Sequence, residues 1–163
     1  MPFSAIAHWR QPRDGDCLPA CVAMVLTHLG ETVDYPKLRH RLETTEIGTP
    51  FSHVDRLRSW RLQVERGHGD LSTLQHQLAS GHPVIVAVAT EFLPDWLTRP
   101  DLDDSARLVE HAVVVVGLTE DSVAVYDPDL AKAPQLVELD WFLAAWQGQY
   151  YRYAVIRRRG WRW

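Results

Sequence analysis

Cysteine is scarce in this sequence, with only Cys17 and Cys21 among 163 residues. Two cysteines that lie four positions apart do not make a disulfide framework, and free thiols suit a reducing compartment. No apolar run approaches the roughly 18 residues that span a bilayer, and residues 1–10 lack a charged segment followed by an apolar one. We therefore expect a cytoplasmic protein without stable membrane insertion.

An excess of charge is also missing. The formal net charge is −4 and the sequence pI is near 6.0, so the composition indicates no basic surface for nucleic acid. The eight histidines show no paired zinc-ligand spacing, and neither a P-loop nor a dinucleotide-binding glycine fingerprint is present. We expect no nucleic-acid partner, no metal and no organic cofactor.

What remains is an ordinary globular composition. Hydrophobic residues make up 46% of the chain and charged residues 23%, which suits one domain with a normal core. No stretch is repetitive or compositionally biased enough to suggest a second unit. We expect residues 1–163 to form a single domain.

A polar loop turns into an apolar helix at Cys17. Residues 11–16 read Gln-Pro-Arg-Asp-Gly-Asp, and the apolar positions of residues 20–29 predict a helix. Asp16 directly precedes this helix and is predicted to cap it. The free N–H groups and the positive dipole end of a helix N-terminus stabilise a thiolate. Cys17 is therefore a candidate nucleophile, the alternative being a small buried apolar residue.

A nucleophilic cysteine needs a base, and the base needs an orienting partner. His111 opens a β-branched run, residues 119–122 supply turn chemistry, and a second strand ends at Asp127. In an antiparallel pair, Asp127 returns to the end of the ladder where His111 lies. A carboxylate there holds the imidazole by one nitrogen and leaves the other for Cys17. Taken singly, His111 also fits a strand-end histidine and Asp127 a turn residue.

The rest of the chain alternates between helical and strand patterns. Cys21, one turn into the first helix, is interpreted as a core residue. Helices are expected over residues 35–42, from a cap at Ser52 to Trp60, from a cap at Asp70 to Gly81, and over 139–146, and strands over 61–65 (ended by Gly67-His68-Gly69), 83–89 and 150–156.

Three motifs together carry a family resemblance. The patterns Gln-x4-Asp-Cys-x3-Cys-x2-Met, His-x-Val-Val-Val-x-Gly and Tyr-Asp-Pro resemble the papain-like cysteine peptidases of family C39. Those domains remove double-glycine leader peptides from bacteriocin-type precursors at the N-terminus of ABC exporters, and they have stand-alone relatives. Three shorter segments fall between these motifs in family order: Gly48-Thr-Pro-Phe-Ser, Asp70-Leu-Ser-Thr-Leu and Gly81-His-Pro-Val-Ile-Val-Ala-Val.

The resemblance implies an α+β papain-like fold, in which an N-terminal helical part carries the cysteine helix and a C-terminal antiparallel sheet carries the His and Asp. It implies that Cys17 is the nucleophile and His111 the general base and acid. It further implies that Asp127 orients His111 and that Gln11 supplies the oxyanion-hole side chain. The family usually has Gly directly after the cysteine, whereas this chain has Leu18. We expect Leu18 to reshape the subsite beside the nucleophile.

The function implied is a cysteine peptidase that hydrolyses a peptide or small-protein substrate, with a Gly-Gly type site as one specificity. Two alternatives use the same residues: a papain-like acyltransferase or amidase, and a catalytically silent peptide-binding module. The sequence leaves two settings open: action alone, or action as an accessory to an exporter or to a modification or defence system.

Two segments stand apart from these patterns. Residues 91–110 are irregular and rich in aspartate, and we interpret them as a flap beside the cleft that favours a basic substrate segment. The alternative is a mobile acidic surface loop. The tail at residues 157–163 carries four arginines and two tryptophans, and a disordered or folded-back terminus is the expectation.

Overall fold

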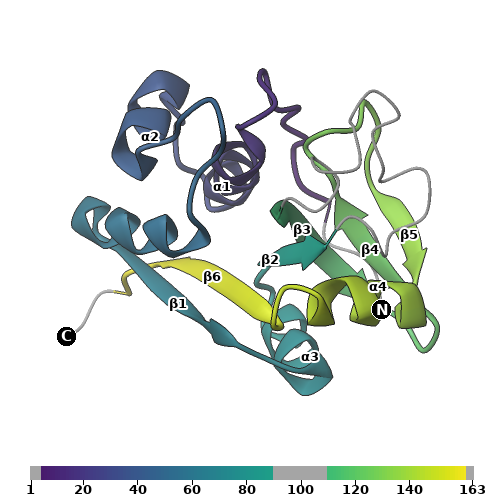
Figure 1. Ribbon diagram of the computed structural model, residues 1–163. Coiled ribbons are helices and arrows are strands. Elements are labelled where there is room, and N and C mark those ends of the chain that lie inside the picture. The colour runs from purple at the N-terminus through teal and green to yellow at the C-terminus, as the bar shows by residue number, and fades with distance from the viewer. Residues whose placement is uncertain (1–4, 90–109, 161–163) are drawn as a thin grey trace.

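The computed structural model describes residues 5–89 and 110–160. In chain order the elements are α1 (Cys17–His28), α2 (Tyr35–Leu42), the 3₁₀ helix η1 (Phe51–Trp60), β1 (Leu62–His68), α3 (Leu71–Ala79), β2 (Val84–Ala89), β3 (Glu110–Leu118), β4 (Ser122–Tyr126), β5 (Gln135–Glu138), α4 (Leu139–Gln147) and β6 (Arg152–Arg158). The strands form one antiparallel sheet in the order β1-β6-β2-β3-β4-β5. The α+β architecture expected from the sequence is confirmed (Figure 1).

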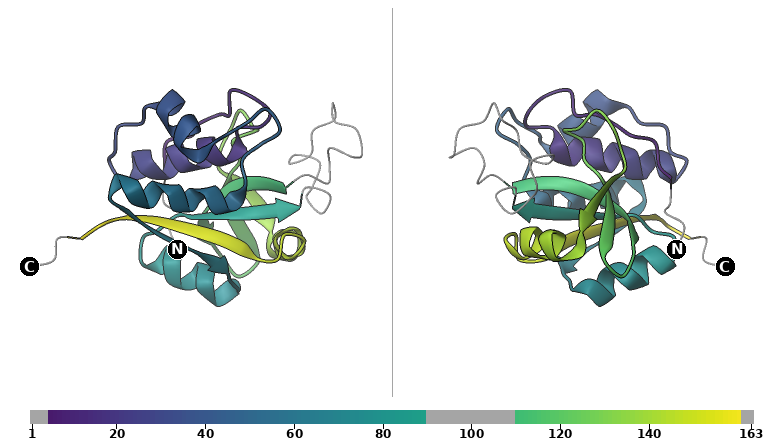
Figure 2. Two further views of the ribbon diagram at one scale, coloured as in Figure 1. Left: turned by 60° about the vertical axis from the view of Figure 1, so that its left-hand side comes forward. Right: turned by 90° about the vertical axis from the view of Figure 1, so that its right-hand side faces the viewer.

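Helices cover both faces of this sheet. As Figure 2 shows, α1, α2 and η1 lie on one side, and α3 and α4 lie on the other. Successive strand residues point to opposite faces, so Ile85 and Ala87 of β2 join the core under α1, while Val84, Val86 and Val88 join the core over α3 and α4. A strand buried on both faces reads as an unbroken apolar run, which explains the sequence of β2.

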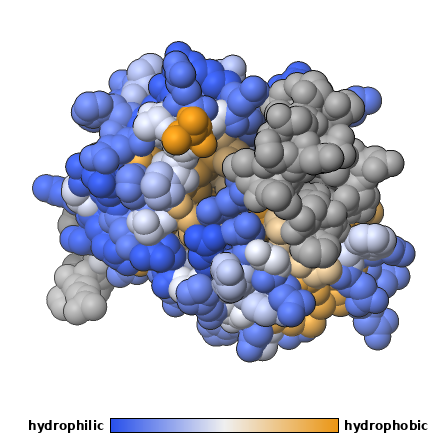
Figure 3. Space-filling model, in the orientation of Figure 1, coloured by the Kyte–Doolittle hydropathy of each residue, from blue (hydrophilic) through white to orange (hydrophobic). Residues whose placement is uncertain are grey.

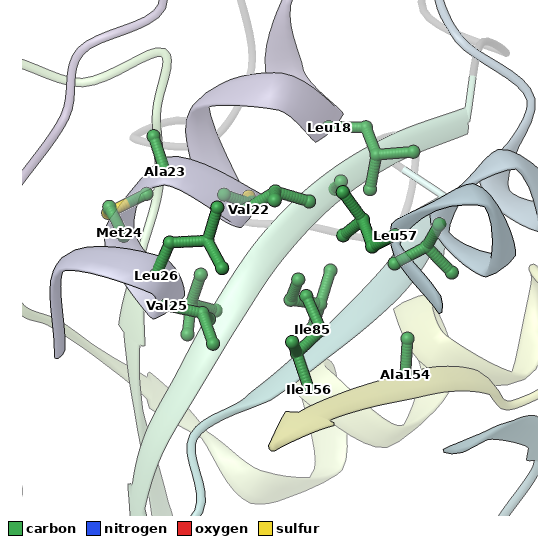
Figure 4. Packing of buried hydrophobic residues seen from close by; sticks show 14 of the residues in the cluster. Leu18, Val22, Ala23, Met24, Val25, Leu26, Leu57, Ile85, Ala154 and Ile156 are labelled. Carbon is green, nitrogen blue, oxygen red and sulfur yellow. The ribbon is translucent and has the colours of Figure 1, made fainter. Parts of the chain in front are cut away.

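Helix α1 lies inside the molecule rather than on its surface. All nine residues from Leu18 to Leu26 are buried, and they pack between η1, α2 and the sheet (Figure 4). A helix that is apolar on all sides is stable only when it is enclosed in this way. Cys17, the first residue of α1, thus stands where a rigid buried helix meets the surface.

Several expected elements differ from the observed ones. The helix predicted after Ser52 is a 3₁₀ helix that follows Pro50, and it has no side-chain cap. Strand β1 does not stop at Gly67 but pairs through His68 with β6. Gly67 opposes Tyr153 in this ladder, and a Cβ atom on Gly67 would make only ordinary contact with that ring. Strand β5 was not expected.

The C-terminal strand lies inside the sheet, between β1 and β2. It begins at Arg152 rather than at residue 150, because Tyr150 and Tyr151 both adopt positive φ values, of 60° and 56°. Arg157 and Arg158, expected in a disordered or folded-back tail, belong to β6, and Arg158 pairs with Glu31 at 3.1 Å. The tail prediction is therefore wrong for these two residues.

The flap predicted over residues 91–110 lies outside the described residues, apart from Glu110, which begins β3. Over the described ranges, no helix is both long enough and apolar enough to cross a membrane.

Candidate active site

The loop that leads into α1, residues 11–16, is called the nucleophile loop here because Cys17 follows it. It packs closely against the turn at residues 45–48. A Cβ atom on Gly15 would lie only 2.6 Å from the carbonyl oxygen of Thr45 and 2.8 Å from that of Glu46. Only glycine permits this approach, so Gly15 fixes the path of the chain just before the nucleophile. The Cys17 side chain remains partly exposed.

Asp16 occupies the N-cap position of α1 but does not cap it. Its side chain makes no hydrogen bond to the first turn of the helix. The carboxylate turns inward instead, and its Oδ2 accepts hydrogen bonds from Arg39 Nε at 2.9 Å and from the Tyr35 hydroxyl at 3.0 Å. A charged donor is a stronger partner than a neutral backbone N–H, so the predicted cap is wrong.

Asp16 is fully buried, and its Oδ1 has no hydrogen-bond partner among the described residues. Burial and the neighbouring Asp16 carboxylate raise the pKa of Tyr35 well above its usual range. The Tyr35 ring also stacks on Trp9, with ring centroids 5.8 Å apart. These contacts tie the nucleophile loop to α2. No local pattern in the sequence predicts these contacts, because Tyr35 and Arg39 lie 19 and 23 residues away from Asp16.

Leu18 is a core residue. Only 1% of its surface is exposed, and it joins the apolar cluster between α1, η1 and the sheet. Figure 4 shows it beside Leu57 of η1. The expectation that Leu18 reshapes the subsite next to the nucleophile is therefore not supported by its position, because the side chain points into the interior.

His111 and Asp127 meet at one end of the sheet. Strands β3 and β4 pair with Val114 opposite Tyr126, so the start of β3 and the end of β4 come together. His111 Nε2 lies 2.7 Å from Asp127 Oδ1. Asp127 is fully buried, and the backbone N–H of Asp129 donates to the same oxygen at 2.9 Å. This carboxylate is held in place from two sides.

His111 contacts both the acid and the thiol. Burial lowers the pKa of His111, but the charge and hydrogen bond of Asp127 raise it, as does a hydrogen bond with the Cys17 side chain, so that the net pKa lies well above 6.5. Since Nε2 faces Asp127, Nδ1 is the nitrogen left for the thiol. The arrangement can take a proton from Cys17 and hold the resulting imidazolium.

Cys21 lies close to these groups without being available for chemistry. It is completely buried, and burial, followed by the charges of Cys17 and Asp127, raises the pKa of its thiol well above 9.0. A buried protonated thiol is a poor nucleophile. The interpretation of Cys21 as a core residue is confirmed.

Gln11 runs beside the end of β4. Its backbone N–H donates to the carbonyl of Pro128 at 2.7 Å, which brings the nucleophile loop alongside Asp127. Its side-chain Nε2 donates to the carbonyls of Arg13 and Asp14 at 3.0 and 3.1 Å. The amide that the resemblance assigns to an oxyanion hole is thus engaged within its own loop.

Nothing in the described part of the chain groups three or more His, Cys, Asp or Glu side chains as a metal site would. The groups brought together at this end of the sheet are a thiol, an imidazole and a carboxylate.

Solved structures share this fold. A C39-like peptidase from Bacillus anthracis is 19% identical, with a TM-score of 0.73 over 94% of this chain and 95% of that one. The peptidase domain of Streptococcus ComA, a bifunctional ABC transporter of a quorum-sensing pathway, is 22% identical, with a TM-score of 0.71 over 93% and 97%. A double-glycine-motif protease from an AMS/PCAT transporter, solved with a leader peptide, is 15% identical, with a TM-score of 0.68 over 96% and 94%.

Because the sequence identities are below 25%, these structural matches establish only the fold. It is the papain-like fold of C39 peptidase domains. No curated protein matches the sequence. The profile of the Peptidase_C39 like family, however, matches residues 3–154, which include the whole nucleophile loop, His111 and Asp127. This protein belongs to the Peptidase_C39 like family.

Proposed function

We propose that this protein is a cysteine peptidase that hydrolyses a peptide or small-protein substrate. One observation carries the proposal: His111 contacts both the Cys17 side chain and the buried Asp127 carboxylate. Nucleophile, base and orienting acid thus form one connected chain, as thiol catalysis requires. The family and the fold support the same reaction.

The reaction begins with transfer of the Cys17 proton to His111. The product is a thiolate and imidazolium pair, which Asp127 stabilises through its 2.7 Å contact with Nε2. The positive end of α1 favours the thiolate as well, because Cys17 is the first residue of that helix.

The thiolate then attacks the substrate carbonyl carbon, and a negative oxygen develops. The backbone N–H of Cys17 lies in the first helical turn, where N–H groups have no partner within the helix. The Gln11 amide is the second donor, and it reaches the oxygen by leaving the carbonyls of Arg13 and Asp14. An oxyanion donor contributes about 3–4 kcal/mol to the stability of a transition state.

His111 next protonates the departing amine, and the C–N bond breaks to leave a thioester on Cys17. Water, deprotonated by His111, attacks the thioester and releases the acid. The thiol and the imidazole are restored. Every proton in this cycle passes through His111, while its Nε2 keeps the contact with Asp127.

The proposed cleavage site is of the Gly-Gly type. This extension rests on the solved relatives, one of which is a double-glycine-motif protease in complex with a leader peptide. The burial of Leu18 supports it, since the residue that replaces the family glycine is removed from the substrate side. We further propose a cytoplasmic enzyme that serves an exporter or a modification or defence system.

The test is intact-mass spectrometry after incubation with a stoichiometric peptide vinyl sulfone that ends in Gly-Gly. We expect one adduct in the wild type and in Cys21→Ala, and none in Cys17→Ala. If iodoacetamide labels Cys17 but the probe does not, the Gly-Gly specificity is wrong. If neither reagent labels Cys17, the peptidase assignment is wrong.

A further inference from the structure

A basic pocket lies between α2 and η1, on the face that carries the nucleophile loop. Its volume is about 390 Å³, and its lining includes Arg39, His40, Arg41 and Arg56 with a single carboxylate, that of Glu43. The chain as a whole has a net charge of −4, so this concentration of positive charge runs against the overall balance. Hydrophilic residues dominate the surface over these two elements (Figure 3).

Two of these arginines are fixed in place through Nε alone. Arg39 Nε donates to Asp16 Oδ2 at 2.9 Å, and Arg41 Nε donates to the carbonyl of Arg56 at 3.0 Å. Within the described residues, the terminal nitrogens of both guanidinium groups make no hydrogen bond. Such groups are held in position while the paired terminal nitrogens, which match a carboxylate, stay available.

Arg56 is the third guanidinium, and it is already paired. Its NH1 donates to Glu43 Oε1 at 2.8 Å, and both side chains are partly exposed. An exposed pair of this kind contributes little to stability. Glu43 thus balances Arg56, and Asp16 balances Arg39 from inside the protein. Arg41 is the arginine of this pocket that has no carboxylate partner among the described residues.

The pocket is coupled to the nucleophile loop by direct contact. Arg39 reaches Asp16, and Asp16 precedes Cys17. Glu43 and Thr44 of the pocket lead directly into the turn at residues 45–48 that packs on Gly15. The pocket is therefore linked to the nucleophile loop at two points, Asp16 and Gly15.

We propose that this pocket binds an acidic side chain, Asp or Glu, of the peptide substrate. The inference rests on the proposed peptidase function and extends it to the substrate's charge. Guanidinium and carboxylate groups form the strongest common side-chain pairing, particularly when partly buried. A water molecule takes up about 30 Å³ in the liquid, so a carboxylate side chain fits with several waters.

A different explanation of these residues is structural. Arg39, His40 and Arg41 form the last turn of α2, where positive side chains compensate the helix dipole. That role predicts a loss of stability when Arg41 is replaced, and no effect on peptide binding. Binding and stability must therefore be measured on the same variants.

The experiment uses the full chain carrying Cys17→Ala, so that binding is read without turnover. The probes are fluorescein-labelled peptides that end in Gly-Gly and carry a Glu-Glu pair at successive positions, each with a Gln-Gln counterpart. By fluorescence anisotropy at low salt, we expect one Glu-Glu register to bind roughly tenfold tighter than its Gln-Gln counterpart. The advantage should shrink as salt is added, because exposed charges are screened.

Arg41→Gln and Arg56→Gln should each remove most of that advantage. Arg159→Gln is the matched control, because it also removes one exposed positive charge but lies outside this pocket, beyond the end of β6. Thermal denaturation of each variant separates lost binding from lost folding.

Three results would overturn the proposal. The first is equal affinity for Glu-Glu and Gln-Gln peptides in every register, and the second is an equal loss of affinity in Arg41→Gln and Arg159→Gln. The third is displacement of the Glu-Glu peptide by both a phosphoserine peptide and inorganic phosphate at lower concentrations than by unlabelled Glu-Glu peptide. Failure of the proposed peptidase function looks different, because Cys17 of the wild type would then resist both the vinyl sulfone and iodoacetamide whatever the peptides do.

Discussion

Two groups of residues surround Cys17, and they differ in where they come from. Its sequence neighbours, Asp16 and Leu18, are both buried and face away from the thiol, one toward α2 and the other into the core. The residues that interact with the thiol come from the sheet, about 100 residues later in the sequence. They are His111 in β3, which contacts Cys17, and Asp127 after β4, which contacts His111. The neighbours hold the loop in place, and the distant pair supplies the chemistry.

The two buried carboxylates make the contrast concrete. Asp16 and Asp127 are each fully buried, and each has one oxygen without a hydrogen-bond partner among the described residues. Asp16 faces Arg39, a cation that does not titrate in proteins, and so it acts as a fixed anchor. Asp127 faces His111, a base that can take up and release a proton. The same side chain serves structure or catalysis according to its partner.

The largest expected effect is that of Asp127→Asn. The imidazole should lose the charge that stabilises it, so kcat/KM for a Gly-Gly peptide should fall about 10³–10⁴-fold, as in other triads. The matched variant Asp16→Asn should lower the melting temperature and keep kcat/KM within about tenfold. Equal losses of activity in the two variants would contradict the assignment of a structural role to Asp16 and a catalytic role to Asp127.

Leu18→Ala tests the other sequence neighbour of Cys17, which should affect stability and not catalysis. Because Leu18 is 1% exposed and packed in the core, its truncation should cost about 3 kcal/mol of unfolding free energy. KM for Gly-Gly peptides should stay constant. Chemical denaturation and steady-state kinetics check both points. A changed KM with unchanged stability would mean that Leu18 contacts the substrate rather than the core.

Arg39→Gln should have a smaller effect on stability. It leaves the buried Asp16 carboxylate without its cation, but the Arg39 side chain is itself 21% exposed, so water can partly replace it. We expect a loss of about 2 kcal/mol. The double variant Asp16→Asn/Arg39→Gln should recover part of this loss in urea unfolding, whereas additive losses would mean that the two side chains act independently.

The smallest expected effect is a pH dependence of stability. The folded-state pKa of His111 lies above its ordinary value of 6.5. Its contact with Asp127 therefore stabilises the fold fully below about pH 6.5, and this contribution is lost as pH rises through the higher folded-state value. The unfolding free energies of wild type and His111→Gln should differ by ~1.5 kcal/mol more in mild acid than in alkali. A gap that widens with pH would contradict the sign.

The sequence predicted the distant pair better than the close neighbours. A strand, a turn and a second strand fix which ends of a hairpin meet, so the contact between His111 and Asp127 follows from local patterns. The direction of the Asp16 and Leu18 side chains depends instead on where α2 and η1 pack, and local patterns do not encode that.

Strand boundaries show the same limit. Residues 150 and 151 have strand-like composition, yet their positive φ values place them in a turn. Gly67 looks like a strand breaker, yet it pairs inside β1 opposite Tyr153 of β6. Residues 150 and 151 bond back to the end of α4, and Gly67 bonds to a distant strand. In both cases the boundary depends on a neighbouring element that local composition does not specify.

The central claim is that His111 activates Cys17, and alkylation tests it most directly. The rate of iodoacetamide modification at Cys17 should be measured by intact mass at pH 6 in Cys21→Ala and in Cys21→Ala/His111→Ala. The thiolate and imidazolium pair predicts rapid alkylation in the first variant and a rate at least ~10-fold lower in the second. Undiminished alkylation without His111 would contradict the account.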